Sequence, residues 1–496
     1  MQPSASASQT SAVPGLIAFV IAITLLMLAA FLNSVWALAI GLSGLAFLFA
    51  TIMVQQLTVL PYLNPVALIS AGTGVFYFLG SALNQFVRAA MPANPFIQFN
   101  RVWANYDVLP TIAAALIVVL CCYAGVWSSR LFTVLTQRVD KQPRAAIVAL
   151  VLGVVAVFLS YLVLTGKLTV TSGARALKAA EDSEWLTLAG AAAPAAALPL
   201  AYLVLSRDAA RYRTLGLIFA LPIVAANFML GRRYVIALGL SFIIGLIVYR
   251  KVHIKWWQWT AAIVSAIIVV AALTVPFNNL RTLNDTGRQF TFKEAAAVML
   301  SGERVQGAGY MGAADMLALT AARADILREL AQVADRMPAS GLTYGEGIIS
   351  QAAVVVPGQF WPDKKVYMAT EMYSDGRILN AAGMPATDIA GSLVMYAFGE
   401  FGWAAPLYFA AVLVAFVLAA LGLARLFGSD SGFHLWTLSL LLSYVVLADN
   451  ATGYRMFADL RFLLILGVLH GLIGFLLPKT VAVISSGPQP IRTGVR

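Results

Sequence analysis

Long apolar runs dominate the pattern of this chain. Runs of about 20 residues, each long enough to cross a hydrocarbon layer of ~30 Å as a helix, recur from the N-terminus almost to the C-terminus. The pattern predicts an all-α polytopic membrane protein of twelve transmembrane helices. The predicted spans are 13–32, 35–54, 59–82, 110–129, 146–165, 186–206, 214–230, 234–250, 257–277, 404–424, 433–449 and 461–478.

The spans divide the chain into four parts. Residues 1–277 hold the first nine spans, and 278–388 form one large loop. Residues 389–478 hold a re-entrant or interfacial helix and the last three spans, and 479–496 are a polar tail. No Lys or Arg precedes the first run, so it lacks the charged start of a signal peptide and is interpreted as a true span.

Basic residues set the predicted orientation. Lys and Arg near span ends stay in the cytoplasm during insertion. Three alternate connections are basic, and with the C-terminal tail they fall on one side of the membrane. Both termini are therefore expected in the cytoplasm, and the large loop on the opposite, outer face. These basic residues are Arg130, Arg138, Lys141 and Arg144, then Arg207, Arg211 and Arg213, then Arg250, Lys251 and Lys255, with Arg425 and Lys479 beyond them.

Within the large loop, 313–337 has the spacing of an amphipathic helix. Apolar residues recur at the helical period, with Asp325 and Arg328 expected on another face. This helix is expected to pack over the membrane-embedded part. The apolar positions are Met316, Leu319, Ile326, Leu330 and Val333. A glycine- and proline-rich stretch follows, and the apolar segment 389–402 is interrupted by Gly399 and Gly402, which favours a re-entrant or interfacial helix.

Composition excludes several classes of protein. The chain is 60% hydrophobic and 11% charged, with a mean hydropathy of +0.84, which rules out a soluble cytosolic enzyme. The adjacent Cys121 and Cys122 can supply neither a disulfide framework nor a zinc site. The sequence has no Walker loop, GxGxxG turn or Cys/His ligand set, so neither a cofactor nor a metal is expected.

The net charge of +11 directs attention to arginines at the outer face. Arg232 and Arg233 lie in a very short outer connection, where two readings stay open: an anchor for lipid headgroups, or a site for a substrate diphosphate. Arg281 and Arg288 follow the ninth span. Guanidinium groups bind phosphate oxygens in pairs, although a solvated loop explains these two residues equally well.

Two further groups of cations lie on the outer side. Trp361, Lys364, Lys365 and Arg377 fall within one short stretch of the loop, where an aromatic ring suits a sugar and the cations suit a diphosphate. A solvated charged loop is the default interpretation of such a pattern. Arg455 lies in the last outer connection. An ion pair with Asp459 explains Arg455 as readily as a ligand contact.

A general base at the outer face is expected to be a carboxylate. All three histidines fall away from the outer loops, which argues against a Ser-His-Asp hydrolase. Asp388 is the first candidate because it ends the large loop where the chain re-enters the membrane, and the other candidates are Glu400, Glu371, Glu346 and Asp449. A carboxylate held away from water at such a position is suited to accepting a proton.

The segment 347–402 resembles the Wzy-type oligosaccharide repeat-unit polymerases of bacterial surface polysaccharide assembly. The resemblance is carried by Val355-Val-Pro357 leading to Trp361-Pro-Asp-Lys-Lys365, by Pro385-Ala-Thr-Asp388 with Gly391, and by Phe398-Gly-Glu-Phe-Gly402. The resemblance covers about 55 residues. It does not extend to the arginines outside this segment, so their expected roles rest on their positions alone.

The resemblance implies a metal-independent glycosyltransferase of GT-C-like architecture in the bacterial inner membrane. Such an enzyme joins undecaprenyl-diphosphate-linked oligosaccharide units at the periplasmic face, and undecaprenyl diphosphate leaves. Asp388 or Glu400 would accept the proton of the attacking hydroxyl. The implied partners are the lipid-linked oligosaccharide, membrane lipids, a chain-length regulator and a flippase, with no nucleic acid. Three alternatives remain: an O-antigen ligase, a lipid-linked oligosaccharide flippase, and a non-catalytic scaffold.

Overall fold

The structure is a computed structural model in which every regular element of the described residues is helical. It describes residues 12–58, 64–94, 108–129, 144–165, 196–206, 209–229, 234–249, 313–337, 341–347, 392–427, 431–446 and 453–476, with the single residues Gln258, Ala261, Lys293, Glu294 and Ile378. The predicted span 257–277 thus lies almost wholly outside the described residues.

The helices follow the predicted apolar runs. In the first half they are α1 (Ala12–Leu32), α2 (Val35–Thr58), α3 (Pro65–Ala90), α5 (Val108–Ser128), α6 (Arg144–Leu164), η3 (Ala210–Tyr212), α9 (Arg213–Met229) and α10 (Tyr234–Tyr249). In the second half they are α13 (Ala313–Ala324), α14 (Ile326–Arg336), α17 (Leu393–Phe401), η5 (Gly402–Ala404), α18 (Ala405–Phe427), α19 (Ser431–Val446) and α20 (Gly453–Leu476).

Several helices are long and apolar enough to cross a membrane. Among the described residues there are six, or seven if the bent pair Ala196–Leu205 and Ala210–Asn227 forms one span. The six are Val35–Gln56, Pro65–Ala90, Val108–Ser128, Arg144–Leu162, Leu393–Phe427 and Arg455–Leu476. The chain therefore has the helices of a multi-pass membrane protein, whereas the number twelve and the two-sided orientation stay predictions.

The third span differs from its predicted bounds of 59–82. Helix α3 begins at Pro65, because Asn64 caps it by accepting a 3.4 Å hydrogen bond from the Ala67 amide. It continues to Ala90, although Asn84, Gln85 and Arg88 are polar. Asn84 and Gln85 are each only 1% exposed, so neighbouring helices shelter this extension from the lipid.

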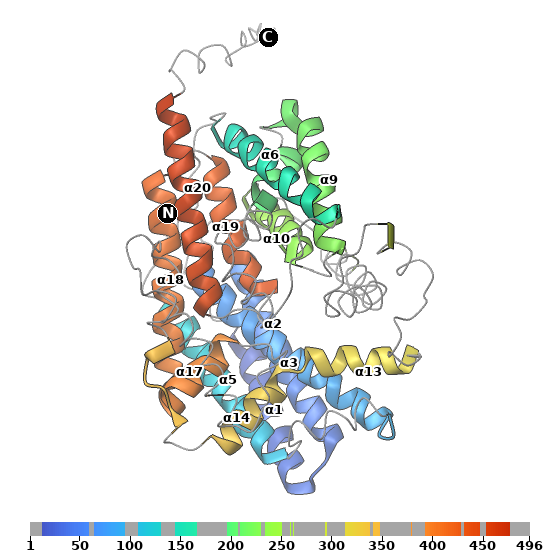
Figure 1. Cartoon of the computed structure of the whole chain (residues 1–496). Helices are drawn as coiled ribbons and strands as arrows, with labels where there is room; N and C mark the ends of the chain where they lie inside the picture. Colours follow the sequence, from blue (N-terminus) through green and yellow to red (C-terminus); the bar gives the residue numbers. More distant parts are fainter. Residues whose placement is uncertain are drawn as a thin grey trace, which may run out of the picture.

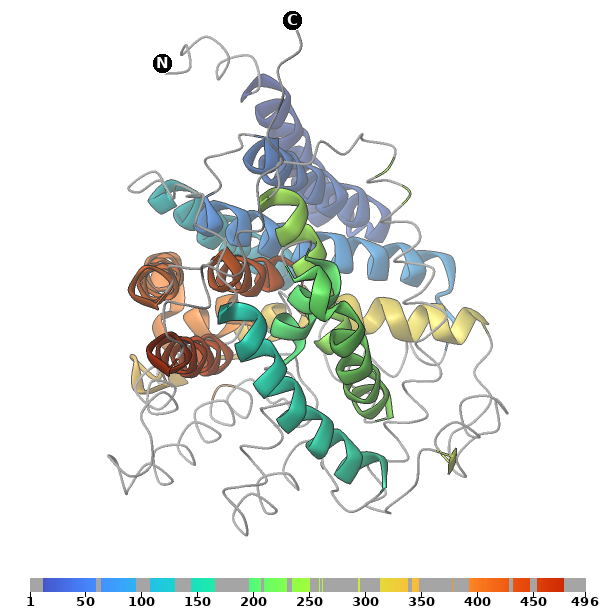
Figure 2. The same ribbon diagram turned by 90° about the horizontal axis from the view of Figure 1, so that it is seen from above.

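Helix α3 lies at the centre of the bundle. It packs against α2, α5, α13 and α19, while α1 covers the far side of α2 (Figure 1). Helix α18 packs along α5 and α20. A second group, α6, α9 and α10, joins this bundle through α19 and α20, and the view from above shows α6 and α9 crossing beside it (Figure 2).

The predicted amphipathic helix 313–337 is two helices, α13 and α14, which break at Asp325. The expected packing is confirmed: α13 lies on α3, α14 lies on α5 and α3, and Ile326, Leu330 and Val333 are buried. The placement of Asp325 on the polar face was wrong, because its side chain is 1% exposed and caps α14 from inside the packed interface.

Of the predicted re-entrant or interfacial segment 389–402, the structure describes the residues from Ser392 onward. They continue through a short break into α18, and Leu393–Phe427 together is one candidate membrane span, so the re-entrant helix stays a prediction. Helix α17 ends at Phe401, one 3-10 turn follows, and α18 begins at Ala405. Gly402 makes this break possible, since its φ of +56° lies in the left-handed region that side chains with a Cβ rarely adopt.

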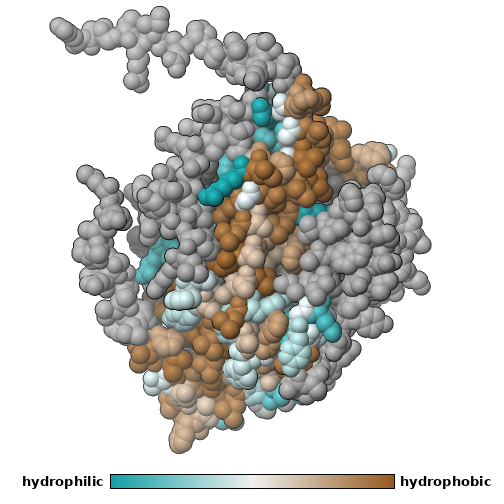
Figure 3. Space-filling model, turned by 90° about the vertical axis from the view of Figure 1, so that its left-hand side faces the viewer, coloured by the Kyte–Doolittle hydropathy of each residue, from teal (hydrophilic) through white to brown (hydrophobic). Residues whose placement is uncertain are grey.

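The outward side of α18 and α20 is apolar along much of its length, and brown hydrophobic residues cover that face (Figure 3). The exposed side chains there include Leu407, Leu418, Leu426, Leu472 and Phe475. Such a surface suits contact with lipid rather than with water.

Candidate functional site

Three of the predicted site residues, Glu400, Arg455 and Glu346, belong to the described residues. The others lie outside them: Asp388, Glu371, Asp449, Arg232, Arg233, Arg281, Arg288, Trp361, Lys364, Lys365 and Arg377. The site is therefore built from the surroundings of Glu400, in the last turn of α17, and of Arg455, in the first turn of α20.

Glu400 fastens a turn of the large loop to the end of α17. Its carboxylate Oε2 accepts a hydrogen bond from the Gly345 amide, and its carbonyl oxygen accepts one of 3.0 Å from the Tyr344 amide. Thr343 adds a third, since its amide lies 3.3 Å from the Gly399 carbonyl oxygen. Residues 341–347 are here called the Glu400 turn. The amides of three consecutive residues in this turn, from Thr343 to Gly345, are thus bonded to the last turn of α17.

This arrangement satisfies the Glu400 carboxylate inside the protein. The residue is only 1% exposed, and an ionised carboxylate away from water needs donors of its own. The Gly345 amide is such a donor. The Glu400 carboxylate therefore helps to hold the turn in place.

The backbone of the Glu400 turn also has an unusual conformation, with two residues at positive φ. Tyr344 has a φ of +47° and Gly345 a φ of +92°. Glycine adopts such angles freely, but tyrosine does so only when its surroundings hold it there. The hydrogen bonds to Glu400 supply that restraint, and Phe401 packs close to Gly345.

The start of α17 is fixed by a second polar contact. The Ser392 hydroxyl caps α17 by accepting a 3.2 Å hydrogen bond from the Met395 amide, and it also bonds to the hydroxyl of Tyr77 on α3. Both hydroxyl groups are buried. Helix α17 is therefore attached to α3 at its first turn and to the Glu400 turn at its last.

Arg455 belongs to a three-residue cluster between α19 and α20. Its Nε lies 3.6 Å from Asp459 Oδ2, and the Tyr444 hydroxyl donates a 2.6 Å hydrogen bond to that same oxygen. The Arg455 guanidinium carbon also lies 5.4 Å from the centre of the Tyr444 ring, within reach of a cation–π contact. The ion pair considered from the sequence thus exists, with Tyr444 as a further partner.

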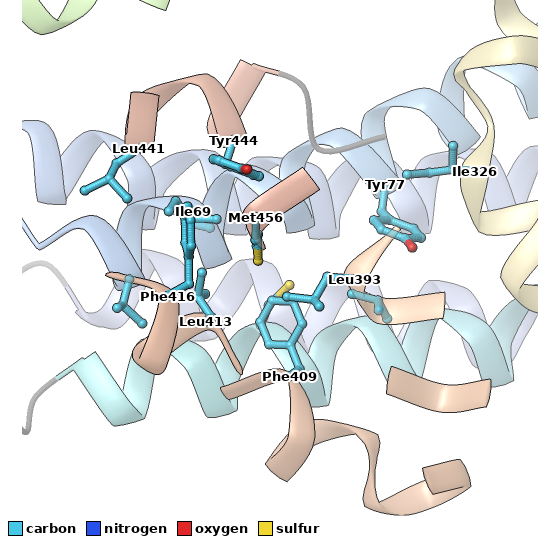
Figure 4. Close-up of a cluster of buried hydrophobic side chains, with 14 of the residues drawn as sticks. Ile69, Tyr77, Ile326, Leu393, Phe409, Leu413, Phe416, Leu441, Tyr444 and Met456 are labelled. Carbon is cyan, nitrogen blue, oxygen red and sulfur yellow. The ribbon is translucent and has the colours of Figure 1, made fainter. Parts of the chain in front are cut away.

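A shared apolar core connects these polar clusters. Met456 lies next to Arg455 in the chain, and its side chain points toward Phe409 of α18 and Leu393 of α17 (Figure 4). Tyr444 and Tyr77 belong to the same cluster (Figure 4). Packing therefore fixes the first turn of α17 and the first turn of α20 relative to one another.

Sequence reasoning missed a buried polar row along α3. Its members recur three or four residues apart and so share one helix face. Each is at most 4% exposed, and the row contributes the Tyr77 contact to α17 and an Asn84 contact to Asp325. The row consists of Ser70, Thr73, Tyr77, Ser81 and Asn84. The period of polar residues within an apolar span was the signal that could have revealed it.

The described residues contain no group of three or more His, Cys, Asp or Glu side chains placed to hold a metal ion. Among them, the chemistry available near α17 and α20 consists of an anchored carboxylate, an oriented guanidinium group and exposed aromatic rings.

Comparison with known proteins found no matching family model, no matching curated protein and no matching solved structure.

Proposed function

We propose that this protein is an inner-membrane polysaccharide polymerase, a glycosyltransferase that joins polyprenyl-diphosphate-linked oligosaccharide units at the outer face of the bacterial inner membrane. The proposal includes the twelve spans, the cytoplasmic termini and the periplasmic large loop expected from the sequence. It keeps the ligase and the flippase as the alternatives to be tested.

One observation carries the proposal. The segment 348–391 contains Trp361, Lys364, Lys365, Arg377 and Asp388. The described residues that flank it, the Glu400 turn and Ser392, are both attached to α17. At one end the Glu400 turn is bonded to the last turn of α17, and at the other Ser392 is bonded to Tyr77 at the first turn. A helix of nine residues spans about 13 Å, so both ends of the segment are fastened close together.

A second observation supports the orientation that the proposal requires. The Asn64 side chain at the start of α3 donates a 2.7 Å hydrogen bond to the Ser129 carbonyl oxygen just past the end of α5. The orientation expected from the basic connections assigns both positions to the cytoplasmic side. Contact between them agrees with that assignment.

In the proposed reaction an acceptor sugar hydroxyl attacks the anomeric carbon of the donor sugar. The bond from that carbon to the diphosphate oxygen breaks, and polyprenyl diphosphate leaves. Asp388 accepts the hydroxyl proton, and arginines stabilise the negative charge that develops on the diphosphate. Glu400 holds the Glu400 turn at the end of α17 and remains the second candidate for accepting this proton. Arg455, oriented by Asp459 and Tyr444, is one of the guanidinium groups facing the leaving group.

The test is the chain-length profile of the surface polysaccharide in a deletion strain complemented with single variants. Wild type should restore long ladders, and Asp388→Asn, Arg232→Ala and Arg288→Ala should leave single repeat units. Asp335→Asn and Arg336→Ala are the matched controls, since both residues are exposed at the end of α14, and they should restore ladders. Membrane levels of every variant must equal that of wild type.

Two results of the deletion alone would indicate a function other than polymerisation. Long chains that stay on the lipid carrier would indicate a ligase. Lipid-linked units retained on the cytoplasmic side would indicate a flippase.

A further inference from the structure

Tyr344 is an exposed aromatic residue that lies outside the long apolar helices. The large apolar side chains that are most exposed in the described residues lie mainly on long apolar helices. Tyr344 lies instead in the Glu400 turn, and it is 68% exposed. A ring of this size is left exposed although hydrogen bonds hold the main chain beneath it.

The main chain at Tyr344 is fixed in an unfavourable conformation. Its φ of +47° is rare for tyrosine, and its amide is bonded to the Glu400 carbonyl oxygen at 3.0 Å. The next amide, of Gly345, is bonded to the Glu400 carboxylate. Strained residues that the surroundings hold in place occur preferentially where a ligand is bound. The ring is thereby oriented before any ligand arrives, which lowers the cost of binding.

A carboxylate accompanies the ring. Glu346 is exposed two residues farther along, and its amide closes the turn through a 3.1 Å hydrogen bond to the Thr343 carbonyl oxygen. The C–H bonds on one face of a pyranose carry partial positive charge and suit the negative face of an aromatic ring. Carboxylate oxygens accept hydrogen bonds, which the hydroxyl groups of a sugar supply.

We propose that the Glu400 turn is a sugar-binding site, in which the Tyr344 ring stacks on a pyranose and Glu346 accepts hydrogen bonds from its hydroxyl groups. The ligand class is a neutral oligosaccharide segment of the repeat unit. This inference rests on the proposed function for the identity of that oligosaccharide. The site uses none of the cations proposed for the diphosphate, and it gives a reason for the hydrogen bonds that attach the turn to α17.

The test uses the full-length purified protein in lipid nanodiscs and a probe without diphosphate. The probe is the repeat-unit oligosaccharide released by mild acid from the surface polysaccharide of the same bacterium. Its dissociation constant and its saturation-transfer NMR contacts are measured for wild type and variants. Maltose serves as the unrelated sugar and should bind at least tenfold more weakly than the probe to wild type.

Tyr344→Asn is the decisive variant. Asparagine tolerates positive φ better than most residues, so the turn is retained while the ring is removed. It should weaken probe binding at least tenfold, and Glu346→Gln should weaken it severalfold. Tyr344→Phe keeps the ring and should bind as wild type does. Tyr161→Leu removes another exposed tyrosine, on α6, and should also leave binding unchanged.

Undetectable probe binding to wild type, or equal binding by Tyr344→Asn, would overturn the inference. The two proposals fail separately. Normal ladders in the deletion strain would remove the polymerase while leaving probe binding to Tyr344 intact. Loss of ladders in that strain, together with equal probe binding by Tyr344→Asn, would remove only the sugar site.

Discussion

The side-chain amide of Asn84 on α3 donates a 2.7 Å hydrogen bond to the Asp325 carboxylate at the break between α13 and α14. Each residue is 1% exposed. The other carboxylate oxygen of Asp325 accepts a 3.2 Å bond from the Arg328 amide at the start of α14. One buried side chain therefore ends α13, begins α14 and attaches both helices to the central span.

Asp325→Ala should destabilise the protein by about 2–4 kcal/mol, because it removes a helix cap and leaves the Asn84 amide buried without this acceptor. The measurement is the free energy of unfolding in detergent, with the thermal midpoint as a second readout. Asp335→Ala, at an exposed position of the same helix, should change stability by less than about 0.5 kcal/mol. The double variant with Asn84→Ala should cost less than the sum of the two single variants.

Gly80→Ala should weaken the packing of α13 and α14 on α3. A Cβ at Gly80 would overlap the carbonyl oxygen of Ala324, and main chain cannot move aside as a flexible side chain can. Gly422 on α18 has nothing within 4 Å of an added Cβ, so Gly422→Ala should be neutral or stabilising by up to ~1 kcal/mol. Thermal midpoints of the two variants should move in opposite directions or differ by several degrees. Equal midpoints would contradict the close approach at Gly80.

Two variants of Glu400 separate its anchoring role from a role as proton acceptor. Glu400→Gln keeps an oxygen that can accept from the Gly345 amide, whereas Glu400→Ala keeps none. Glu400→Gln should therefore retain most polymerisation, and Glu400→Ala should lose it and become more sensitive to chymotrypsin at Tyr344. Loss of activity in Glu400→Gln at a wild-type cleavage rate would assign proton transfer to Glu400 instead.

Tyr444→Phe should reduce the ability of Asp459 to orient Arg455. The change removes the 2.6 Å hydrogen bond to Asp459 but keeps the ring under the guanidinium group. Stability should fall by about 1–2 kcal/mol, as expected for a buried carboxylate that loses one donor. Under the proposed function, the polysaccharide ladder should shorten without disappearing, and Arg455→Ala should abolish it. A full-length ladder from Arg455→Ala would exclude this cluster from the reaction.

Cysteine labelling tests the predicted orientation. Cys121 and Cys122 are free and fully buried, so wild type should react little with a membrane-impermeant maleimide. Glu346→Cys should react when only the outer membrane is permeabilised. Arg211→Cys, exposed in η3, should react only after the inner membrane is opened. Reaction of both variants under the first condition would refute the predicted sides.

Periodicity and hydrophobicity determined the elements of this protein. Apolar runs of membrane-spanning length form helices because every backbone polar group in lipid must be satisfied within its own segment. The helices therefore lie where the runs lie, as α2, α5 and α6 do, and the burial of Ile326, Leu330 and Val333 followed from their helical spacing. The positions of the basic residues predict which side of the membrane each connection faces, and the labelling experiment checks this prediction.

Only the tertiary structure decided which polar residues face one another. Asp325 belongs by spacing to a polar face, yet α3 covers it and Asn84 satisfies it. Glu400 lies in the segment that carries the family resemblance, and a turn more than fifty residues earlier in the chain supplies a hydrogen-bond donor to its carboxylate. These contacts join distant segments, and whether a buried polar group finds a partner depends on packing that no local pattern contains.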